Sequence, residues 1–258
     1  MELGLGTATI RSLGRRASQA DVDRLVAGAR ALGVRYFDTA DSYGSGSAER
    51  ALGKALRRSD GPGVAPARVI TKTGYRFVDF PGPLRALNQP FKKLLQAAGA
   101  TYSFPPDGIA RRVGRSLARL RTDRVYVYCL HNPPRSALEP PAISTLLAAL
   151  RAAGGAEGIG VSTDWDSLEL VEGFLADIDL LEVPATLYLA RGEFFERAAR
   201  EHGVEVVVNQ VSRIAASVPE GVVKLAGLRS PPAVVLVGTR RLEHLEEALR
   251  AARSGSAR

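Results

Sequence analysis

Residues 34–44, Val-Arg-Tyr-Phe-Asp-Thr-Ala-Asp-Ser-Tyr-Gly, form a strand-like run that ends at Asp38 and continues into a polar loop carrying Tyr43. Two later runs end in a similar way, Arg68–Lys72 at a lysine and Val125–His131 at a histidine. Parallel strands place their carboxyl ends on one face of a sheet, where parallel-sheet enzymes carry out their chemistry. We therefore expect four side chains to converge in an active site: Asp38, Tyr43, Lys72 and His131.

Apolar runs alternate with helical patterns along the chain, which favours strand–helix repeats and a parallel sheet. Strands are predicted to begin near Leu3, Val34, Arg68, Arg124, Glu157, Leu180, Val204 and Ala233. Helices are predicted at about 19–32, 47–58, 108–121, 138–153, 165–176, 192–202 and 241–253, with a weaker pattern at 212–228. Eight such units predict a parallel (β/α)8 TIM barrel, which typically needs roughly 250 residues, near the 258 of this chain.

The chain is expected to form one domain over residues 1–258, because no linker, repeat or low-complexity tract divides it. Residues 254–258 are predicted to be a disordered tail. The stretch Gly74–Pro106 contains several Pro and Gly residues and little strand pattern. Since it follows the third predicted strand, we expect it to cover the mouth of the barrel as a lid or substrate loop.

Strand alternation predicts which side chains lie beneath the polar ends. If Asp38 points into the barrel, Tyr36 and Val34 lie below it on the same face. The same rule places Ile70 and Cys129 one layer below the ends of the next two runs. Each inward row is thus predicted to be mostly apolar up to its last residue, and Cys129 is interpreted as a small core residue rather than a nucleophile.

The composition narrows the class of protein. The net charge is +8, but the arginines are interleaved with acidic residues, and neither an aromatic-plus-basic cluster nor a zinc-ligand spacing accompanies them. A solvated basic surface is therefore favoured over nucleic-acid binding, no metal site is predicted, and an anionic cofactor would account for part of the charge. A single cysteine, no signal peptide and no membrane-spanning run indicate a cytoplasmic protein without membrane contact. No pattern indicates an oligomeric state.

The four strand-end groups suit proton transfer to an oxygen atom. Lys72 and Asp38 are expected to pair, because either charge is costly to bury alone. The lysine would favour the phenolate of Tyr43, so we expect the pKa of Tyr43 to fall and this residue to act as a general acid. His131 would orient a carbonyl oxygen. None of the four donates hydride, so a redox reaction requires a cofactor. Each residue alone also has a structural interpretation, and their joint position favours the active site.

Several segments resemble the aldo-keto reductases. The most specific, Tyr-Phe-Asp-Thr-Ala-Asp-Ser-Tyr-Gly-Ser-Gly-Ser-Ala-Glu-Arg-Ala-Leu-Gly-Lys-Ala-Leu (36–56), is similar to the family signature. Val-Ile-Thr-Lys-Thr-Gly (69–74) resembles the lysine strand, and Leu-His-Asn-Pro (130–133) resembles the histidine strand. Two further segments resemble cofactor-binding segments, 158–162 and 236–249. Residues 105–117 are similar, more weakly, to the bacterial branch that includes aldose and pyridoxal dehydrogenases.

The resemblance implies a TIM barrel that uses NADPH to reduce an aldehyde or ketone, or to oxidise the corresponding alcohol. Tyr43 would donate the proton, Lys72 and Asp38 would tune it, and His131 would orient the small-molecule carbonyl substrate. Cofactor contacts are implied for Gly6, Thr7, Asp38, Ser162, Thr163, Glu182, Asn209, Gly238, Thr239, Arg240, His244 and Glu247. Ser162 would contact the nicotinamide carboxamide. The segment from Gly238 would lie near the adenosine phosphates, since it opens a predicted helix.

The chain departs from the family pattern in the cofactor half. Thr163 replaces the usual asparagine, Glu182 replaces a glutamine, and Ala248 replaces the asparagine near the adenine. Asn209 occupies the position of a residue that stacks on the nicotinamide, and an amide cannot stack as an aromatic ring does. Two functions therefore follow: an NADPH-dependent carbonyl oxidoreductase, or a protein of this fold without a cofactor that performs elimination or isomerisation or lacks catalysis. A basic binding module is a third interpretation without a supporting motif.

Overall fold

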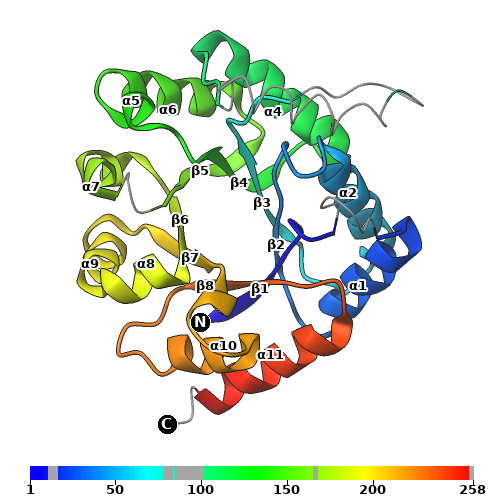
Figure 1. Ribbon diagram of the computed structural model, residues 1–258. Helices are drawn as coiled ribbons and strands as arrows, with labels where there is room; N and C mark the ends of the chain where they lie inside the picture. The colour runs from blue at the N-terminus through cyan, green and yellow to red at the C-terminus, as the bar shows by residue number, and fades with distance from the viewer. Residues whose placement is uncertain (11–16, 78–83, 85–101, 165–167, 256–258) are drawn as a thin grey trace.

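Eight parallel strands close into a barrel in the computed structural model of the chain, which describes residues 1–10, 17–77, 84, 102–164 and 168–255. Each strand pairs with the next along the chain, and β8 closes the cylinder against β1 (Figure 1). The strands are β1 (Glu2–Gly6), β2 (Tyr36–Asp38), β3 (Arg68–Thr73), β4 (Val125–His131), β5 (Ala156–Ser162), β6 (Leu180–Pro184), β7 (Glu205–Asn209) and β8 (Val234–Gly238). The predicted TIM barrel is confirmed.

Helices surround this barrel (Figure 1). They are α1 (Gln19–Ala31), α2 (Ser47–Ser59), α4 (Pro106–Leu120), α5 (Arg135–Leu138), α6 (Ala142–Ala153), α7 (Leu168–Val171), α8 (Ala185–Ala190), α9 (Gly192–His202), α10 (Val218–Ala226) and α11 (Leu242–Gly255). Short 3₁₀ helices follow α7 and β7, η3 (Glu172–Asp177) and η4 (Val211–Arg213). None of the helices in the described ranges is long and apolar enough to cross a membrane.

Local chemistry explains where the observed helices differ from the predicted ones. The helix predicted at 138–153 is interrupted by Pro140 and Pro141, which lack the N–H that a continuous helix needs. The weak pattern at 212–228 becomes a helix only from Val218, after Ser217 caps it by accepting from the backbone N–H of Glu220. Helix α8 was not expected, since its six residues are too few for a periodic pattern.

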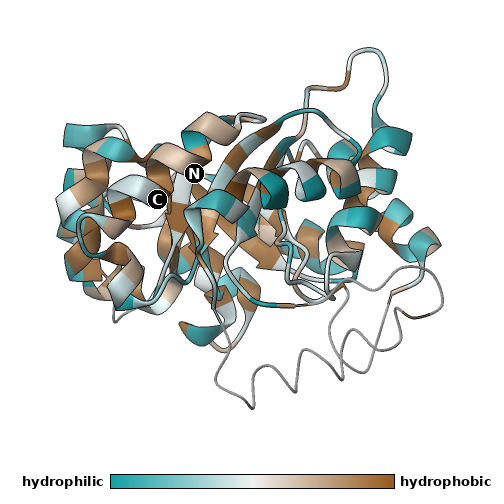
Figure 2. Cartoon of the chain, turned by 90° about the horizontal axis from the view of Figure 1, so that it is seen from above, coloured by the Kyte–Doolittle hydropathy of each residue, from teal (hydrophilic) through white to brown (hydrophobic). Residues whose placement is uncertain are grey.

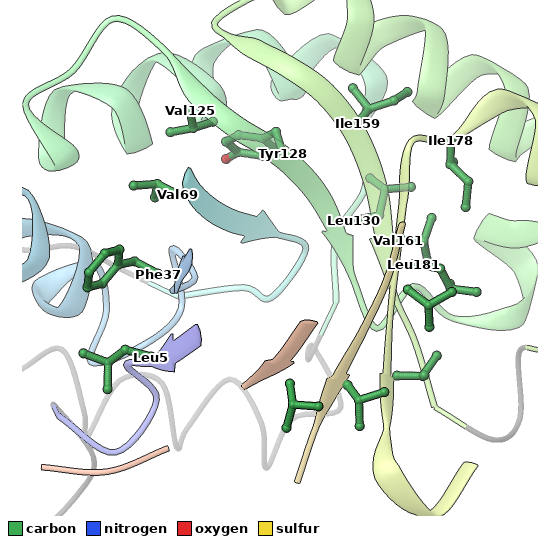
Figure 3. Close-up of a cluster of buried hydrophobic side chains, with 14 of the residues drawn as sticks. Leu5, Phe37, Val69, Val125, Tyr128, Leu130, Ile159, Val161, Ile178 and Leu181 are labelled. Carbon is green, nitrogen blue, oxygen red and sulfur yellow. The ribbon is translucent and has the colours of Figure 1, made fainter. Parts of the chain in front are cut away.

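The barrel strands bury side chains on both faces. The inward cluster contains Tyr36, Ile70, Val127, Cys129, Leu180, Val207, Val234 and Leu236. Outward side chains pack beneath the helices, and Figure 3 labels Leu5, Phe37, Val69, Tyr128, Leu130, Val161 and Leu181 among them. Figure 2 shows the corresponding pattern, with hydrophobic residues concentrated on the strands and hydrophilic residues on the outer faces of the helices.

The predicted inward rows are confirmed except at one position. Tyr36, Ile70 and Cys129 lie inside the barrel, as alternation requires. Val34 instead belongs to the outer cluster, so its assignment to the inward row was wrong. The reason is that β2 begins only at Tyr36, while the backbone N–H of Val34 still bonds the carbonyl of Ala29 at the end of α1. The alternation therefore does not extend back to residue 34.

A polar cluster closes the amino-terminal end of the barrel, and we call it the floor cluster: Tyr36, Arg68, Tyr126 and Glu205. Both tyrosine hydroxyls donate to the Glu205 carboxylate at 2.6 Å, and an Arg68 guanidinium N–H donates to the Tyr36 hydroxyl at 2.6 Å. Arg68 also lies 4.7 Å from the centre of the Tyr126 ring. These contacts hold both carboxylate oxygens and both hydroxyls in protein hydrogen bonds.

Two further expectations concern segments that the structure describes only in part. The predicted tail begins too early, because Ser254 and Gly255 still belong to α11; residues 256–258 lie outside the described residues. Of the predicted lid, residues 78–83 and 85–101 lie outside the described residues. Its two ends meet, since Tyr75 and Tyr102 form an antiparallel bridge. The single-domain assignment over 1–258 stays a prediction.

Candidate active site

Four polar side chains meet at the carboxyl ends of β2, β3 and β6, and we call them the rim cluster: Asp38, Tyr43, Lys72 and Glu182. Lys72 lies at the centre and is fully buried. Its ammonium hydrogen-bonds Asp38 and donates to the backbone carbonyl of Thr39 at 3.1 Å. The Lys72 Nζ lies 3.1 Å from Glu182 Oε2, an ion-pair contact without hydrogen-bond alignment. The predicted pairing of Lys72 with Asp38 is thus confirmed.

The tyrosine and the histidine predicted for the site also reach this point. Lys72 Nζ lies 5.4 Å from the centre of the Tyr43 ring, and this ring meets that of His131 edge to face at 5.7 Å between centroids. On its other side His131 contacts Tyr75, whose ring centre lies 4.7 Å away. All four side chains expected to converge therefore do so, whereas their chemical roles stay predictions.

Burial and charge set the protonation of the cluster. Burial alone lowers the pKa of Lys72, but the charges of Asp38 and Glu182 outweigh it and raise that pKa well above its ordinary value. Burial raises the pKa of Asp38, and the charge of Glu182 adds to the rise while Lys72 opposes it. The cluster therefore contains one firmly charged ammonium between two carboxyl groups.

The expected depression of the Tyr43 pKa is wrong in its net direction. Burial is the largest cause and raises this pKa above its ordinary value. Lys72 does pull it down, as expected, by its charge and by hydrogen bonding, while Asp38 and Glu182 push it up. Sequence reasoning counted the lysine but not the removal of the phenol from water. Tyr43 consequently holds its proton at neutral pH.

A cavity of about 440 Å³ opens beside the rim cluster. Its lining includes six of the predicted site residues, Tyr43, His131, Ser162, Thr163, Glu182 and Asn209. The register explains their meeting, because Ser162 at the end of β5 pairs with both His131 and Glu182 on the neighbouring strands. The Asn209 amide donates to Glu182 Oε1 at 2.7 Å, so it lies beside a carboxylate.

The cavity wall fits an amide ligand. Thr163 Oγ1 and Asn209 Oδ1 are buried, and neither has a hydrogen-bond partner within the described part of the chain. Native proteins rarely leave buried polar atoms unpaired, so such atoms mark a place for a ligand or water. A hydroxyl and an amide oxygen together offer a donor and an acceptor, which match the two halves of a carboxamide.

The other predicted cofactor residues lie where β8 meets α11. Gly6 pairs with both Asp38 and Gly238, which brings this segment to the same end of the barrel. The Thr239 hydroxyl accepts from the backbone N–H of Arg241 at 3.1 Å just before α11 begins. Thr7 is buried, whereas three more residues are exposed on this segment, Arg240, His244 and Glu247. None of these residues lines the 440 Å³ cavity.

A buried network behind the rim was not predicted. Thr73 donates to Asp41 at 2.7 Å, and the backbone N–H of Asp41 bonds the carbonyl of Lys72 at 3.0 Å, which ties the loop carrying Tyr43 to β3. Burial, with the nearby Glu49 charge, raises the pKa of Asp41 to about 7. The sequence signal was the position of Asp41 between Asp38 and Tyr43, in the loop that carries the tyrosine.

Comparisons with known proteins agree with this architecture. Residues 2–216 match the model of the aldo/keto reductase family. Pyridoxal 4-dehydrogenase from Microbacterium luteolum is 27% identical over 266 residues, covering 94% of this chain and 76% of that protein. D-threo-aldose 1-dehydrogenase from a Pseudomonas species is 29% identical over 188 residues, covering 70% of this chain and 55% of that protein.

Solved structures show the same fold. A protein from Pseudomonas aeruginosa assigned to the aldo-keto reductases superposes with a TM-score of 0.73 at 25% identity, covering 98% of this chain and 90% of its own. The holo form of an aldo-keto reductase from Bacillus halodurans superposes with a TM-score of 0.68 at 21% identity, covering 97% of this chain and 86% of its own. The second similarity concerns the fold alone.

Proposed function

The chain belongs to the aldo/keto reductase family, and from this premise we propose that it is an NADPH-dependent oxidoreductase that interconverts an aldehyde or ketone and the corresponding alcohol. Family membership and the two named dehydrogenase relatives establish an oxidoreductase. The observation that supports the specific reaction is the approach of Tyr43 to both Lys72 and His131 at the wall of one cavity.

In the proposed reaction Tyr43 is the general acid. Its hydroxyl donates a proton to the carbonyl oxygen as the carbonyl carbon is reduced, and in the reverse direction the phenolate takes that proton back. Lys72 stabilises the phenolate that remains, because Asp38 and Glu182 raise the pKa of its ammonium and so favour its charged form. His131, in edge contact with the Tyr43 ring, orients the carbonyl oxygen towards the hydroxyl.

A nicotinamide cofactor, when bound, supplies the hydride. The residues available to hold its carboxamide are Ser162, Thr163 and Asn209, which share the cavity with Tyr43. The start of α11 is suited to phosphate groups, because free backbone N–H groups at a helix N-terminus attract anions and Arg240 and Arg241 add positive charge there. NADPH is favoured over NADH by this local charge.

The substrate is proposed to be a polar carbonyl compound. Aromatic and polar groups flank the catalytic histidine: Tyr75 contacts Tyr102 through their hydroxyls at 3.1 Å, and Asn132 donates to Tyr75 at 3.3 Å. Pyridoxal and aldoses are the first compounds to assay, because the two dehydrogenase relatives carry those names.

A second candidate function is non-redox acid–base chemistry on the same fold. One observation favours it: Asn209 and Glu182 bond each other, where the family resemblance implies a stacking residue and a glutamine facing the nicotinamide. Tyr43 and its partners would then catalyse an elimination or isomerisation without a cofactor.

Cofactor titration separates the two candidates. NADPH fluorescence is recorded as the dinucleotide is added to the purified protein. Turnover is then followed with pyridoxal and with an aldose in both directions, as loss of NADPH absorbance or as its appearance from NADP⁺. Saturable binding at micromolar cofactor, followed by turnover, supports the oxidoreductase. An absence of binding at millimolar NADPH would overturn it in favour of the second candidate.

A further inference from the structure

We propose that Glu182 is a second carboxylate counterion of Lys72, a positioning residue that places an additional negative charge beside the Tyr43 hydroxyl and thereby sets the pH at which Tyr43 gives up its proton. The role of Tyr43 in catalysis rests on the function proposed above. The effect of the Glu182 charge on the ionisation of Tyr43 does not depend on that function. The proposal concerns the rim cluster rather than the binding of the cofactor.

The Lys72 ammonium has two carboxylate groups among its neighbours. An ammonium has three N–H donors. Two of them are used in hydrogen bonds, to the Asp38 carboxylate and to the Thr39 carbonyl at 3.1 Å, and Glu182 Oε2 lies in ion-pair contact 3.1 Å from Nζ. Lys72 is fully buried, so the protein rather than water must provide these partners. Glu182 thus supplies, from strand β6, a second carboxylate in ion-pair contact with the ammonium.

The Glu182 carboxylate is buried and held in position by its neighbours. This side chain is 1% exposed, its Oε2 faces the Lys72 ammonium, and its Oε1 accepts from the Asn209 amide at 2.7 Å. One oxygen is therefore hydrogen-bonded to Asn209, and the other lies in ion-pair contact with the Lys72 ammonium. Asn209 also fixes the direction of the carboxylate, so the charge is held at one place in the barrel.

The rim cluster contains more acidic than basic side chains. Among the ion pairs of the described residues, Lys72 is the cation that contacts both Asp38 and Glu182. Burial raises the pKa of Asp38 to about 8, so above that pH, where Tyr43 loses its proton, one positive charge stands between two carboxylates and leaves an excess of negative charge next to the buried phenol. A negative charge at close range makes loss of a proton from a phenol harder. The glutamine implied at position 182 by the family resemblance would be neutral, so Glu182 adds a charge that the resemblance does not imply.

Other ionisable groups around the phenol do not remove this effect. Strand β4 contributes Cys129, a buried thiol whose pKa burial raises well above its ordinary value, and His131, in edge contact with the ring. The remaining charged groups of the cavity wall are Asp164 and Arg213. Strand β5 presents Ser162, which does not titrate. Glu182 therefore remains the group whose charge a single substitution can remove while Asp38 and Lys72 stay paired.

The test measures ionisation of residue 43 without cofactor or substrate. A difluorinated tyrosine, more acidic than tyrosine, is incorporated at position 43, and fluorine NMR follows its chemical shift against pH in the wild-type background and in Glu182→Gln. Glutamine keeps the shape but removes the charge, so the titration midpoint should fall by about one pH unit. An unchanged or higher midpoint in Glu182→Gln overturns the proposal.

Matched variants separate charge from structure. Glu182→Asp retains the charge and should restore the midpoint towards that of the wild type. Glu205→Gln removes a carboxylate from the floor cluster at the other end of the barrel and should leave the midpoint unchanged; a shift there equal to that of Glu182→Gln also overturns the proposal. If Glu182→Gln does not fold, as judged by circular dichroism, Glu182→Met carries the same expectation.

Steady-state rates link the proposal to catalysis and remain distinguishable from it. In the proposed carbonyl reduction, the high-pH decline of kcat/KM should move to lower pH in Glu182→Gln, in step with the fluorine titration. A protein that shows the midpoint shift but no NADPH-dependent turnover would refute the proposed function alone. Turnover with an unshifted midpoint would refute the role of Glu182 alone.

Discussion

The two ends of the barrel use the same kinds of side chain for opposite purposes. The floor cluster and the rim cluster each combine tyrosine, a basic residue and carboxylate oxygens. At the floor, Glu205 receives two hydroxyl donors and Arg68 completes the set, so every strong polar group has a protein partner. At the rim, the Tyr43 side chain borders a cavity, and Thr163 and Asn209 each have a buried polar atom without a hydrogen-bond partner among the described residues.

The difference separates stability from reactivity. A fully paired polar network rigidifies a fold, and removing one member costs the desolvation of the other. A network with unpaired hydrogen-bonding atoms and an excess of negative charge can instead bind a ligand and exchange a proton. Substitutions at the floor should therefore change the free energy of unfolding, and substitutions at the rim should change turnover.

The largest expected effect comes from exchanging one tyrosine at each end for phenylalanine. Tyr43→Phe deletes the transferable proton and should reduce kcat/KM by about 10²–10⁴-fold, with little change in the circular dichroism spectrum. Tyr36→Phe should leave kcat/KM within about two-fold and lower the free energy of unfolding by roughly 1–2 kcal/mol. Near-native turnover of Tyr43→Phe would abolish the distinction between the two ends.

The pH dependence of stability sharpens the comparison next. Burial raises the pKa of Asp41 from 3.8 to about 7, so the folded protein keeps a proton that the unfolded chain releases. The stabilisation is therefore complete below about pH 4 and is lost as the pH rises to about 7. Asp41→Asn should remove this slope, on the order of 2–4 kcal/mol across the range, in urea unfolding at successive pH values.

The floor provides the control for that measurement. Burial and the Glu205 hydrogen bond raise the pKa of Tyr36 to about 12, far above the same range. Tyr36→Phe should accordingly lower stability by a similar amount at pH 4 and at pH 7. A slope that persists in Asp41→Asn, or disappears in Tyr36→Phe, would mean that the titrating group lies elsewhere.

A smaller effect is expected from neutralising the floor carboxylate. Glu205→Gln keeps the side-chain shape but weakens the charged acceptor that Tyr36 and Tyr126 share, so unfolding should become easier by about 1–3 kcal/mol. kcat/KM should remain unchanged, because no floor residue borders the 440 Å³ cavity. A loss of turnover without a loss of stability would contradict the assignment.

The smallest effect tests a single hydrogen bond. Tyr126→Phe removes one donor to Glu205, while the ring keeps its contact with the Arg68 guanidinium 4.7 Å away. The expected cost is about 1 kcal/mol, measurable as a shift of the urea midpoint. A cost larger than that of Glu205→Gln would indicate that the ring contact, rather than the carboxylate, organises the floor.

The comparison also shows which features the sequence could reveal. The strands and the convergence of Asp38, Lys72 and His131 were predictable, because apolar alternation and strand ends are local patterns. Glu205 and Tyr126 could not be paired in advance: they are 79 positions apart and meet only when the barrel closes. Glu182 was recognised as unusual, yet its contact with Lys72 depends on the diameter of the cylinder.

The direction of the Tyr43 pKa was unpredictable for a related reason. A neighbouring ammonium can be inferred from spacing, but the exclusion of water by the completed barrel cannot. The errors in the predicted helices have simpler causes. Pro140 and Pro141 interrupt a segment with helical periodicity, and α8 is too short to show a periodic pattern. The sequence therefore predicts which side chains become neighbours at the strand ends better than it predicts how far water is excluded from them.

The buried thiol of Cys129 can report how often the barrel opens. The thiol is completely buried one layer beneath the rim, and burial raises its pKa, which suppresses the thiolate that alkylating reagents attack. It is also the one cysteine in the chain. The rate at which a maleimide labels the native protein consequently counts how often the cylinder opens. Ligand-induced slowing of that rate would measure, without a substrate, how strongly an occupant holds the strands together.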